Sequence, residues 1–349
     1  MPELVKEYAD KANMLLSFVL QHVEPGHPLV EAARETLVER LIRDITASPE
    51  AYRLRNLGPV HAAVPATPSP YPQDVAAALA DIDLPAIPKV VASLNAALAS
   101  PDASAGQIAQ IIELDPALCA AVLKLVNSPL YSLTAKVDTV TRAVAVLGVK
   151  QVYGLTVSKA VSRTISRMVP DNVDLFLFWE HGIACAIMAK HLGELYGART
   201  PETLFVAGML HDIGKLLQYI LFPDHIQYIF QEIEDKRTST VQAEEDILGF
   251  DHTVLGAMLL EQWGFPDSLV APVRHHHSPL DAPDLRPACA VHVADLLAHV
   301  LTVQPGALAQ APPATRKEWE PLGIEARQMV EFLDGFDDCV QDVMAVMHG

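Results

Sequence analysis

The sequence predicts an all-α protein, and three observations carry this prediction. Ala and Leu are abundant while only 17 of the 349 residues are Gly, a composition that favours helices over sheets. Apolar residues recur at helical spacing along most of the chain, and no run alternates long enough to indicate a strand. Half of the residues are hydrophobic, so the chain can bury a sizeable core in one large domain or two.

The N-terminal residues 1–56 have the pattern of a helical hairpin. Apolar residues at helical spacing cover 3–20 and 28–46, and the Pro and Gly residues of "VEPGHP" separate the two helices. We expect this extension to pack on the core. Residues 57–79 begin with "LGPVHAAVPATPSPYPQD", whose prolines and scarcity of large apolar side chains predict a linker.

The region 80–170 carries the signals of a first group of helices. One helix runs from Lys89 after a pair of prolines, and the next has Asp102 or Ser104 as its N-cap. Asp115 and Pro116 are the residue types expected at the N-cap and the first position of a third helix. A fourth helix ends at Gly148, and another follows at once.

The region 171–303 continues the helical pattern. Its predicted helices lie near 174–197, 201–220, 223–234, 239–248, 251–263, 266–274 and 285–303. The remaining segment, 304–349, is predicted to hold a loop over 304–318 and a terminal helix over 323–347.

Charge and cysteine usage bound the partners and the compartment. The formal net charge of −18 argues against nucleic acid and membranes as partners, because both attract an excess of Lys and Arg. The four cysteines form no CxxC pair, which indicates free thiols in a reducing compartment. The N-terminus lacks the pattern of a secretory signal, and no apolar run approaches the roughly 18 residues of a membrane span. These features predict a cytoplasmic protein.

Histidine is concentrated in one part of the chain, since ten of the fourteen lie between positions 181 and 299. A single histidine is usually solvated or hydrogen-bonded, so the group is tested by its helical spacing. His181 lies on the inward stripe of its helix, and His211 and Asp212 lie together in the apolar stretch "AGMLHDIGKLL". Lys215 follows one turn later on the same face, where its charge suits an anionic ligand beside a metal ion.

Asp295 lies in the strongly apolar helix "CAVHVADLLAHVL". An unpaired carboxylate there would be costly to bury, so it needs a partner such as a metal ion. His292 and His299 share its face and are assigned a packing or surface role, with an outer contact to the site as the alternative.

Four of these residues form a predicted ligand set spread over three helices. His181, His211, Asp212 and Asp295 combine imidazole and carboxylate, which suits Fe, Mn, Zn or Ni. His252 starts the helix "DHTVLGAMLLEQWG", and His276 and His277 lie in "VRHHHSP". These three are predicted to hold a second ion bridged by Asp212, or to contact a phosphate.

The spacing of these residues resembles the metal-dependent phosphohydrolase superfamily named for its HD dipeptide. The preceding segments resemble an HDOD domain over about 80–303: "LPAIPKVVASL", "IAQIIELDPALCAAVLKLVNSPLY", "VTRAVAVLGVKQVYGL", "LFWEHGIACA" and "ACAVHVADLLA". The resemblance implies a helical fold of two subdomains, 80–170 and 171–303, and a role in bacterial signal transduction.

Members of this family are generally non-catalytic, many having lost metal ligands, whereas every ligand position is filled here. Related cyclic-di-GMP phosphodiesterases carry a Gly-Tyr-Pro motif where this chain has "SPLDAPDLRP", so that activity is not expected.

Two functions follow from the sequence. The first is a regulatory module that acts on protein partners or a ligand and retains a divalent transition-metal site. The alternative is a phosphohydrolase acting on a phosphodiester or nucleotide, a phosphorylated small molecule, with Asp212 and Lys215 in catalysis. Glu180 and Asp251 are candidates for a general acid, although each is more simply explained as a charge at a helix end.

Overall fold

The fold is all-α in the computed structural model, which describes residues 2–47, 79, 82–99, 104–127, 133, 135–171, 173–302, 310–333 and 335–347. The predicted linker 57–79 lies outside these residues except for residue 79. Within them, every element is a helix, and one isolated β-bridge joins Val23 to Ala314.

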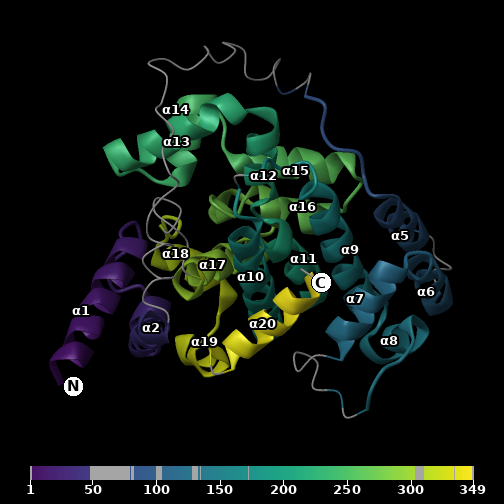
Figure 1. Cartoon of the computed structure of the whole chain (residues 1–349), viewed down its shortest axis with the longest axis horizontal. Helices are drawn as coiled ribbons and strands as arrows, with labels where there is room; N and C mark the ends of the chain where they lie inside the picture. The colour runs from purple at the N-terminus through teal and green to yellow at the C-terminus, as the bar shows by residue number, and fades with distance from the viewer. Residues whose placement is uncertain are drawn as a thin grey trace.

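The N-terminal part contains the hairpin and the first group of helices (Figure 1). Their bounds are α1 Pro2–Val19, α2 Pro28–Ala47, α5 Lys89–Ala99, α6 Ala105–Glu113, α7 Pro116–Val126, α8 Val140–Leu147 and α9 Val149–Ile165. Ser104 caps α6 in a capping box, and the Asp115 carboxylate caps α7 by accepting two backbone N–H groups. Gly148 ends α8 with a φ of 86°, as its position predicted.

The second group of helices surrounds the histidine-rich segments. Its bounds are α10 Leu175–Leu195, α11 Pro201–Leu210, α12 Ile213–Leu221, α13 Pro223–Lys236, α14 Thr240–Leu248, α15 His252–Gln262, α16 Asp267–Arg274, η2 Pro279–Asp281 and α17 Leu285–Leu301. The C-terminal segment adds α18 Arg316–Trp319, η4 Glu320–Leu322, α19 Ala326–Leu333 and α20 Phe336–Met347.

The prediction of one helix over 201–220 was wrong, because the chain turns at His211 and Asp212 between α11 and α12. The His211 ring donates from Nδ1 to the Gly208 carbonyl at 2.7 Å, a local bond that competes with the helical ladder. Asp212 adopts φ −95° and ψ 7°, outside the helical region. The break turns the two polar side chains away from the helix surface and into the interior.

Two predictions for the C-terminal segment were also wrong. The helix predicted over 323–347 is divided into α19 and α20, and Gly335 with φ 79° lies between them. The predicted loop 304–318 contains the start of a short helix at Arg316, because Thr315 and Glu318 form a capping box there.

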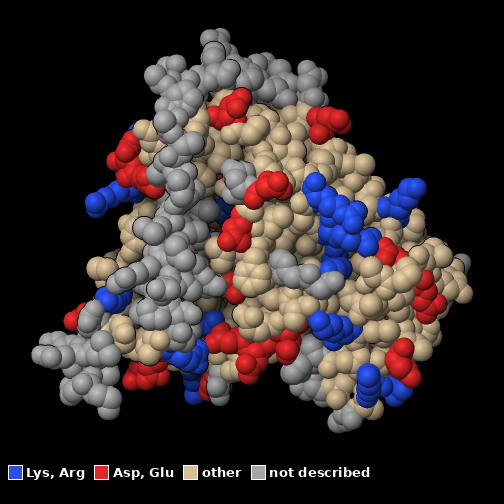
Figure 2. All heavy atoms as spheres, in the orientation of Figure 1, with Lys and Arg blue, Asp and Glu red and all other residues tan. Residues whose placement is uncertain are grey.

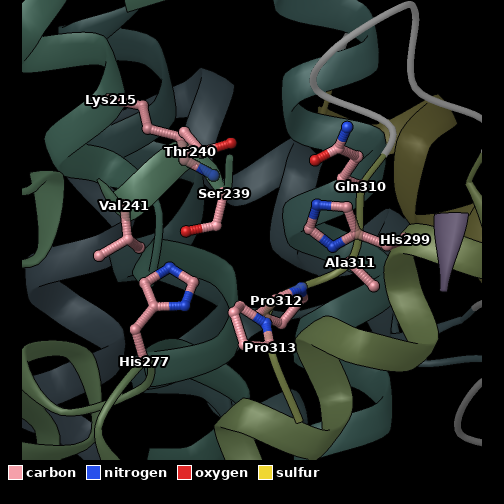
Figure 3. A pocket seen from close by; sticks show the side chains of 10 residues that line it. All are labelled: Lys215, Ser239, Thr240, Val241, His277, His299, Gln310, Ala311, Pro312 and Pro313. Carbon is pink, nitrogen blue, oxygen red and sulfur yellow. The ribbon is translucent and has the colours of Figure 1, made fainter. Parts of the chain in front are cut away.

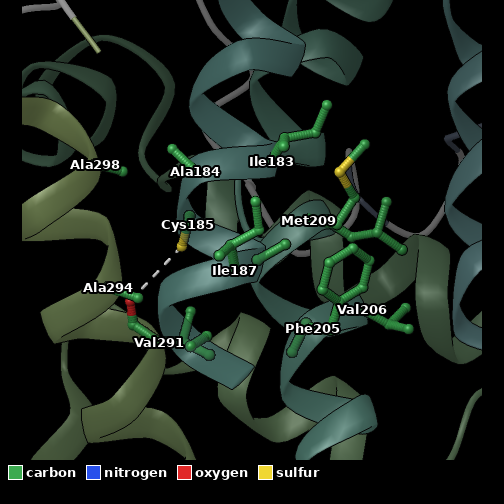
Figure 4. Packing of buried hydrophobic residues seen from close by; sticks show 14 of the residues in the cluster. Ile183, Ala184, Cys185, Ile187, Phe205, Val206, Met209, Val291, Ala294 and Ala298 are labelled. Atoms are coloured by element: carbon green, nitrogen blue, oxygen red, sulfur yellow. Dashed lines mark hydrogen bonds between the residues drawn. The ribbon is translucent and has the colours of Figure 1, made fainter. Parts of the chain in front are cut away.

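The long helix α10 forms the centre of the second group. It packs between α11 and α17, with Ile183, Phe205, Val206 and Val291 among the buried contacts (Figure 4). Gly208 permits the close approach of α10 and α11, because a Cβ there would lie 2.8 Å from the Cys185 carbonyl oxygen.

The N-terminal hairpin packs on the rest of the molecule. Helix α2 contacts α19, and α1 contacts α17, with Leu16 and Leu37 buried in the shared core (Figure 1). Arg43 donates to Asp337 on α20 at 2.7 Å.

The expectation that no apolar run approaches the length of a membrane span was wrong, because Pro201–Leu221 is long and apolar enough to cross a membrane by length and composition. Its 18-residue window is 78% buried inside the protein, and the turn at His211 and Asp212 interrupts it, which is the behaviour of a core segment. On the face drawn in Figure 2, acidic and basic side chains are both spread over the surface.

Candidate metal centre

The predicted site residues come from five separate segments of the chain and meet in the interior. His181 lies in the middle of α10, and His211 and Asp212 form the turn between α11 and α12. The others lie at the start of α15, just after α16 and within α17: His252, His276, His277 and Asp295. All are buried except His277, which is partly buried.

One cluster of donors forms around Asp295. His181 Nε2 lies 3.1 Å from Asp295 Oδ1, and His211 Nε2 lies 3.4 Å from the same oxygen. Asp212 Oδ2 lies 3.5 Å from His211 Nε2 and 3.8 Å from His181 Nε2. Both histidines of the set predicted to share one ion therefore lie close to both of its carboxylates.

A second cluster forms on the other oxygen of Asp212. His252 Nε2 lies 3.1 Å and His276 Nε2 lies 3.8 Å from Asp212 Oδ1. His277 Nε2 lies 3.1 Å from His252 Nε2. Asp212 thus presents one carboxylate oxygen to each cluster, which is the arrangement of a bridging ligand.

Backbone carbonyls fix how two of these rings are protonated. His211 donates from Nδ1 to Gly208 O, and His276 donates from Nδ1 to Val273 O, both at 2.7 Å. A neutral ring with its proton on Nδ1 has a lone pair on Nε2, so each of these rings, once neutral, aims a lone pair at the cluster. This is the tautomer that binds a metal ion through Nε2.

The residues present fit a group of metal ions. His252 Nε2 and His276 Nε2 lie 3.3 Å apart and share a hydrogen bond when the His252 ring is protonated, and a metal ion can take the place of that proton. His211 Nε2 and Asp295 Oδ2 are buried without a hydrogen bond to any described residue. Ligands held roughly 2.1 Å from one ion lie about 3.0 to 3.4 Å apart, which agrees with the shorter separations here.

The electrostatics keep the carboxylates charged. Burial alone would raise the pKa of Asp212, but His211 and Lys215 hold that pKa well below its usual range. The pKa of Asp295 is likewise held low against burial, by His299 and His211. Both side chains therefore remain carboxylates, the form that binds metal.

The histidines divide into two kinds. Burial lowers the pKa of His181 to about 4, and burial together with neighbouring histidines lowers the pKa of His276 and His277. For His252, burial would lower the pKa, but the Glu244 carboxylate overcomes it and raises the pKa to about 9. For His211, burial would likewise lower the pKa, but the Asp212 carboxylate outweighs burial and raises it. A proton therefore occupies each of these two rings until a metal ion displaces it.

Two side chains orient the ligands from outside. Glu244 Oε2 accepts the His252 ring Nδ1–H at 2.7 Å and the His252 backbone N–H at 2.8 Å. His299 Nδ1 lies 2.9 Å from Asp295 Oδ1, which agrees with the alternative considered for His299, an outer contact to the site, over a packing or surface role. Such partners fix ring and carboxylate orientation in metal sites.

Lys215 also acts on a ligand. Its Nζ lies 2.7 Å from Asp212 Oδ2, so the charge predicted to face an anionic ligand is paired with the shared carboxylate. Asp251 caps α15 by accepting the Thr253 backbone N–H at 2.8 Å, which is the simpler explanation considered for it.

Comparison with known proteins decides the family. The family model for the HDOD domain matches residues 84–279, more than half of the chain. The chain belongs to the HDOD family.

Relatives of this HDOD protein include an uncharacterized protein of Treponema pallidum, 24% identical over 214 residues. That match covers 60% of this chain and 41% of the relative, so the chain matches less than half of the relative's length.

Three solved structures share the HDOD fold. An HDOD domain protein of unknown function from Geobacter sulfurreducens has a TM-score of 0.66 at 21% identity, covering 78% of this chain and 96% of its own. A candidate phosphohydrolase from Shewanella amazonensis has a TM-score of 0.61 at 27% identity, covering 76% and 95%. A candidate signal transduction protein from Marinobacter aquaeolei has a TM-score of 0.61 at 25% identity, covering 76% and 60%.

A small pocket lies beside the clusters in the HDOD protein. Figure 3 shows His277 and His299 on opposite sides of it, with Lys215, Ser239 to Val241 and the segment from Gln310 to Pro313 completing the lining. Its volume is about 20 Å³, which accommodates a water molecule but not a phosphodiester.

Sequence reasoning missed Glu244 and the pocket segment from Gln310 to Pro313. Glu244 lies eight residues before His252 on a different helix, a spacing that carries no helical or turn signal. Its burial to 1% exposure is the signal that identifies it, and burial is a property of the folded chain.

Proposed function

We propose that this HDOD protein is a signalling protein with a two-ion metal centre in which Asp212 is shared between the ions. The observation that carries the proposal is the convergence of His252 Nε2 and His276 Nε2 on Asp212 Oδ1, at 3.1 Å and 3.8 Å. Each ring places its Nδ1 against another acceptor, Glu244 for the first and Val273 O for the second. Both Nε2 atoms therefore face the shared carboxylate, where a metal ion would displace the proton of His252.

The donor chemistry selects the metal. His181, His211, Asp212 and Asp295 would hold one ion, and Asp212 with His252, His276 and His277 the other. Mixed imidazole and carboxylate ligands suit Fe, Mn, Zn or Ni rather than Ca or Mg. When bound, such ions supply Lewis-acid chemistry suited to phosphoester hydrolysis.

Phosphoester hydrolysis is the second candidate function, and the completeness of the ligand set favours it. The Shewanella amazonensis relative, 27% identical, is named as a candidate phosphohydrolase. In this function Lys215 keeps the pKa of Asp212 low and lines the pocket where a phosphate would lie. His277 and His299 border the same pocket and would donate to phosphate oxygens.

The size of the pocket favours the regulatory function over hydrolysis. A volume of about 20 Å³ leaves no room for a phosphodiester in this conformation. The Marinobacter aquaeolei relative, 25% identical, is named as a candidate signal transduction protein. We propose that the metal-loaded protein acts on protein partners, with a phosphorylated small molecule as a further ligand.

Elemental analysis of untagged protein purified without chelator tests the metal centre. We expect about two equivalents of transition metal in the wild type and a loss of both in Asp212→Ala, because both clusters share that carboxylate. His275→Ala is the matched control, since His275 belongs to the same histidine run but to none of the clusters. Equal metal content in wild type and Asp212→Ala would contradict the proposal.

A substrate assay on metal-loaded protein separates the two functions. Bis-p-nitrophenyl phosphate and a panel of nucleotides serve as substrates, with Lys215→Met and His275→Ala compared with wild type. Turnover that Lys215→Met abolishes at unchanged metal content favours hydrolysis. Loaded protein that turns over none of these substrates favours the regulatory function.

A further inference from the structure

One wall of the pocket comes from outside the helices that carry the metal clusters. Gln310, Ala311, Pro312 and Pro313 form this wall, across from Lys215 and His277 (Figure 3). We call residues 310–316 the strap. Because the pocket holds little more than a water molecule with the strap in place, the position of the strap determines what reaches His277 and His299.

The strap is bound by residues 19–27, which comprise the last residue of α1 and the chain that joins it to α2. We call these residues the connector. Ala311 donates its backbone N–H to Val19 O at 2.9 Å, and Glu24 donates its backbone N–H to Ala314 O at 2.8 Å. Val23 and Ala314 form the parallel β-bridge. Side chains extend this contact at both ends of the strap: His22 Nε2 lies 3.0 Å from Gln310 Oε1, and Glu24 Oε2 accepts the Arg316 backbone N–H at 2.8 Å.

Besides the packing of its buried residues Ala311 and Ala314, the strap makes few other hydrogen bonds. Pro312 and Pro313 have no backbone N–H, so the residues nearest the pocket cannot donate a backbone hydrogen bond to it. Among the described residues, Ala311 and Ala314 each make one backbone hydrogen bond to another segment. In both cases that segment is the connector. The strap thus rests on the pocket by packing and is fixed in place from the N-terminal side.

We propose that the strap is a gate over the metal centre and that the α1–α2 connector is its latch. The latch joins the N-terminal hairpin, which the family match 84–279 does not include, to the wall of the pocket. Gln310 belongs to both, since its side chain lines the pocket and contacts His22.

Opening the gate does not require the hairpin to leave the core. Leu16 and Leu37 stay buried, and Arg43 stays paired with Asp337, when only the bonds between connector and strap break. Glu24 and Arg316 are exposed, so water can replace their hydrogen bond. The gate is inferred from the geometry of the strap alone. Only its role in controlling access to metal ions rests on the proposed function.

A reversible disulfide tests the gate in the full chain. The bridge partners in Val23→Cys/Ala314→Cys lie at strand spacing, about 4.8 Å, which is within reach of a disulfide. The readout is the rate at which diethylpyrocarbonate modifies His277 and His299 in metal-free protein, measured by mass spectrometry. We expect the oxidised form to be modified at least tenfold more slowly than the reduced form. Wild type treated with the same oxidant controls for the native cysteines.

A second variant opens the gate. Glu24→Ala removes the acceptor of the Arg316 N–H, and we expect modification of His277 and His299 to become several-fold faster. Glu31→Ala removes a carboxylate from an exposed position on α2 and should leave the rate unchanged. Identical rates in the oxidised and reduced double variant would overturn the gate. Because the readout needs no metal, that result is independent of whether the metal centre exists. In Zn²⁺-loaded protein, the oxidised double variant should also lose its ion to a chelator more slowly than the reduced one.

Discussion

At the scale of single residues, the site combines ligands that the sequence predicts with supports that it does not. His181, His211, Asp212 and Asp295 were predicted together because polar residues in apolar helices must have partners, and the structure brings them together. The contact of Glu244 with His252 depends on how α14 and α15 meet, which no local spacing encodes, whereas His299 and Asp295 are neighbours at i,i+4 on α17. The predicted metal binding itself stays a prediction.

The first prediction concerns the pH dependence of metal binding at His252. Below a pKa of about 9 this ring carries a proton that the ion must displace, so affinity falls as pH falls, by up to tenfold per unit. Glu244→Gln removes the charge that opposes burial, which lowers the pKa of His252 and should flatten the dependence between pH 6.5 and 8.5. Chelator competition measures the affinity. The control is the exposed neighbour Glu245→Gln, and a wild-type affinity independent of pH would refute the mechanism.

The second prediction concerns His299. Its Nδ1 lies 2.9 Å from Asp295 Oδ1, and losing such an outer partner typically costs about 10- to 100-fold in metal affinity. We expect that loss in His299→Leu, measured by titration calorimetry. His299→Asn keeps a donor near the same place and should recover most of the affinity. Equal weakening in both variants would mean that the ring only fills space.

At the scale of elements, the sequence predicts most helices and their caps but not the break at His211 and Asp212. Ser104, Asp115 and Gly148 act through bonds to their own neighbours, so local sequence is enough to place those helix ends. The sequence predicts one continuous helix over the apolar stretch 201–220. A segment buried on all sides has no periodic pattern of polar and apolar residues, so the pattern cannot mark a break within it. The turn between α11 and α12 is fixed by packing against α15, a contact distant in sequence.

Gly214 makes that packing possible, and this gives the third prediction. A Cβ at Gly214 would overlap the His252 carbonyl oxygen, which is rigid backbone at the start of α15. We expect Gly214→Ala to destabilise the protein by at least about 2 kcal/mol, read from the urea midpoint, and to weaken metal binding by displacing His252 from Asp212. Gly256→Ala is the matched control on the facing helix, because its Cβ would be in ordinary contact with its neighbours, the nearest being the Ile213 side chain at 3.4 Å. Equal stability of the two variants would show that α12 can move away from α15.

At the scale of the whole molecule, the resemblance of the sequence to HDOD domains predicted the fold, and the family match confirms it. The relation between the N-terminal hairpin and the pocket could not be predicted, because it rests on hydrogen bonds between residues nearly 300 positions apart. His22 and Gln310 are an example. Neither the connector nor the strap contains a motif that indicates the other, so only the folded chain shows their contact.

The last prediction is that metal ions stabilise the whole chain without being required for its fold. A ligand present at 100 times its Kd adds about 2.7 kcal/mol to the free energy of unfolding, so Tm should rise on the order of 5 °C on loading. The chain should stay helical when a chelator removes the ions, because its core is continuous from Leu16 through Leu210 to Met344 and does not depend on the site. Thermal melts followed by circular dichroism measure both effects. Asp212→Ala should melt at one temperature with or without metal, whereas loss of helical signal on chelation of the wild type would show that the ions hold the fold itself.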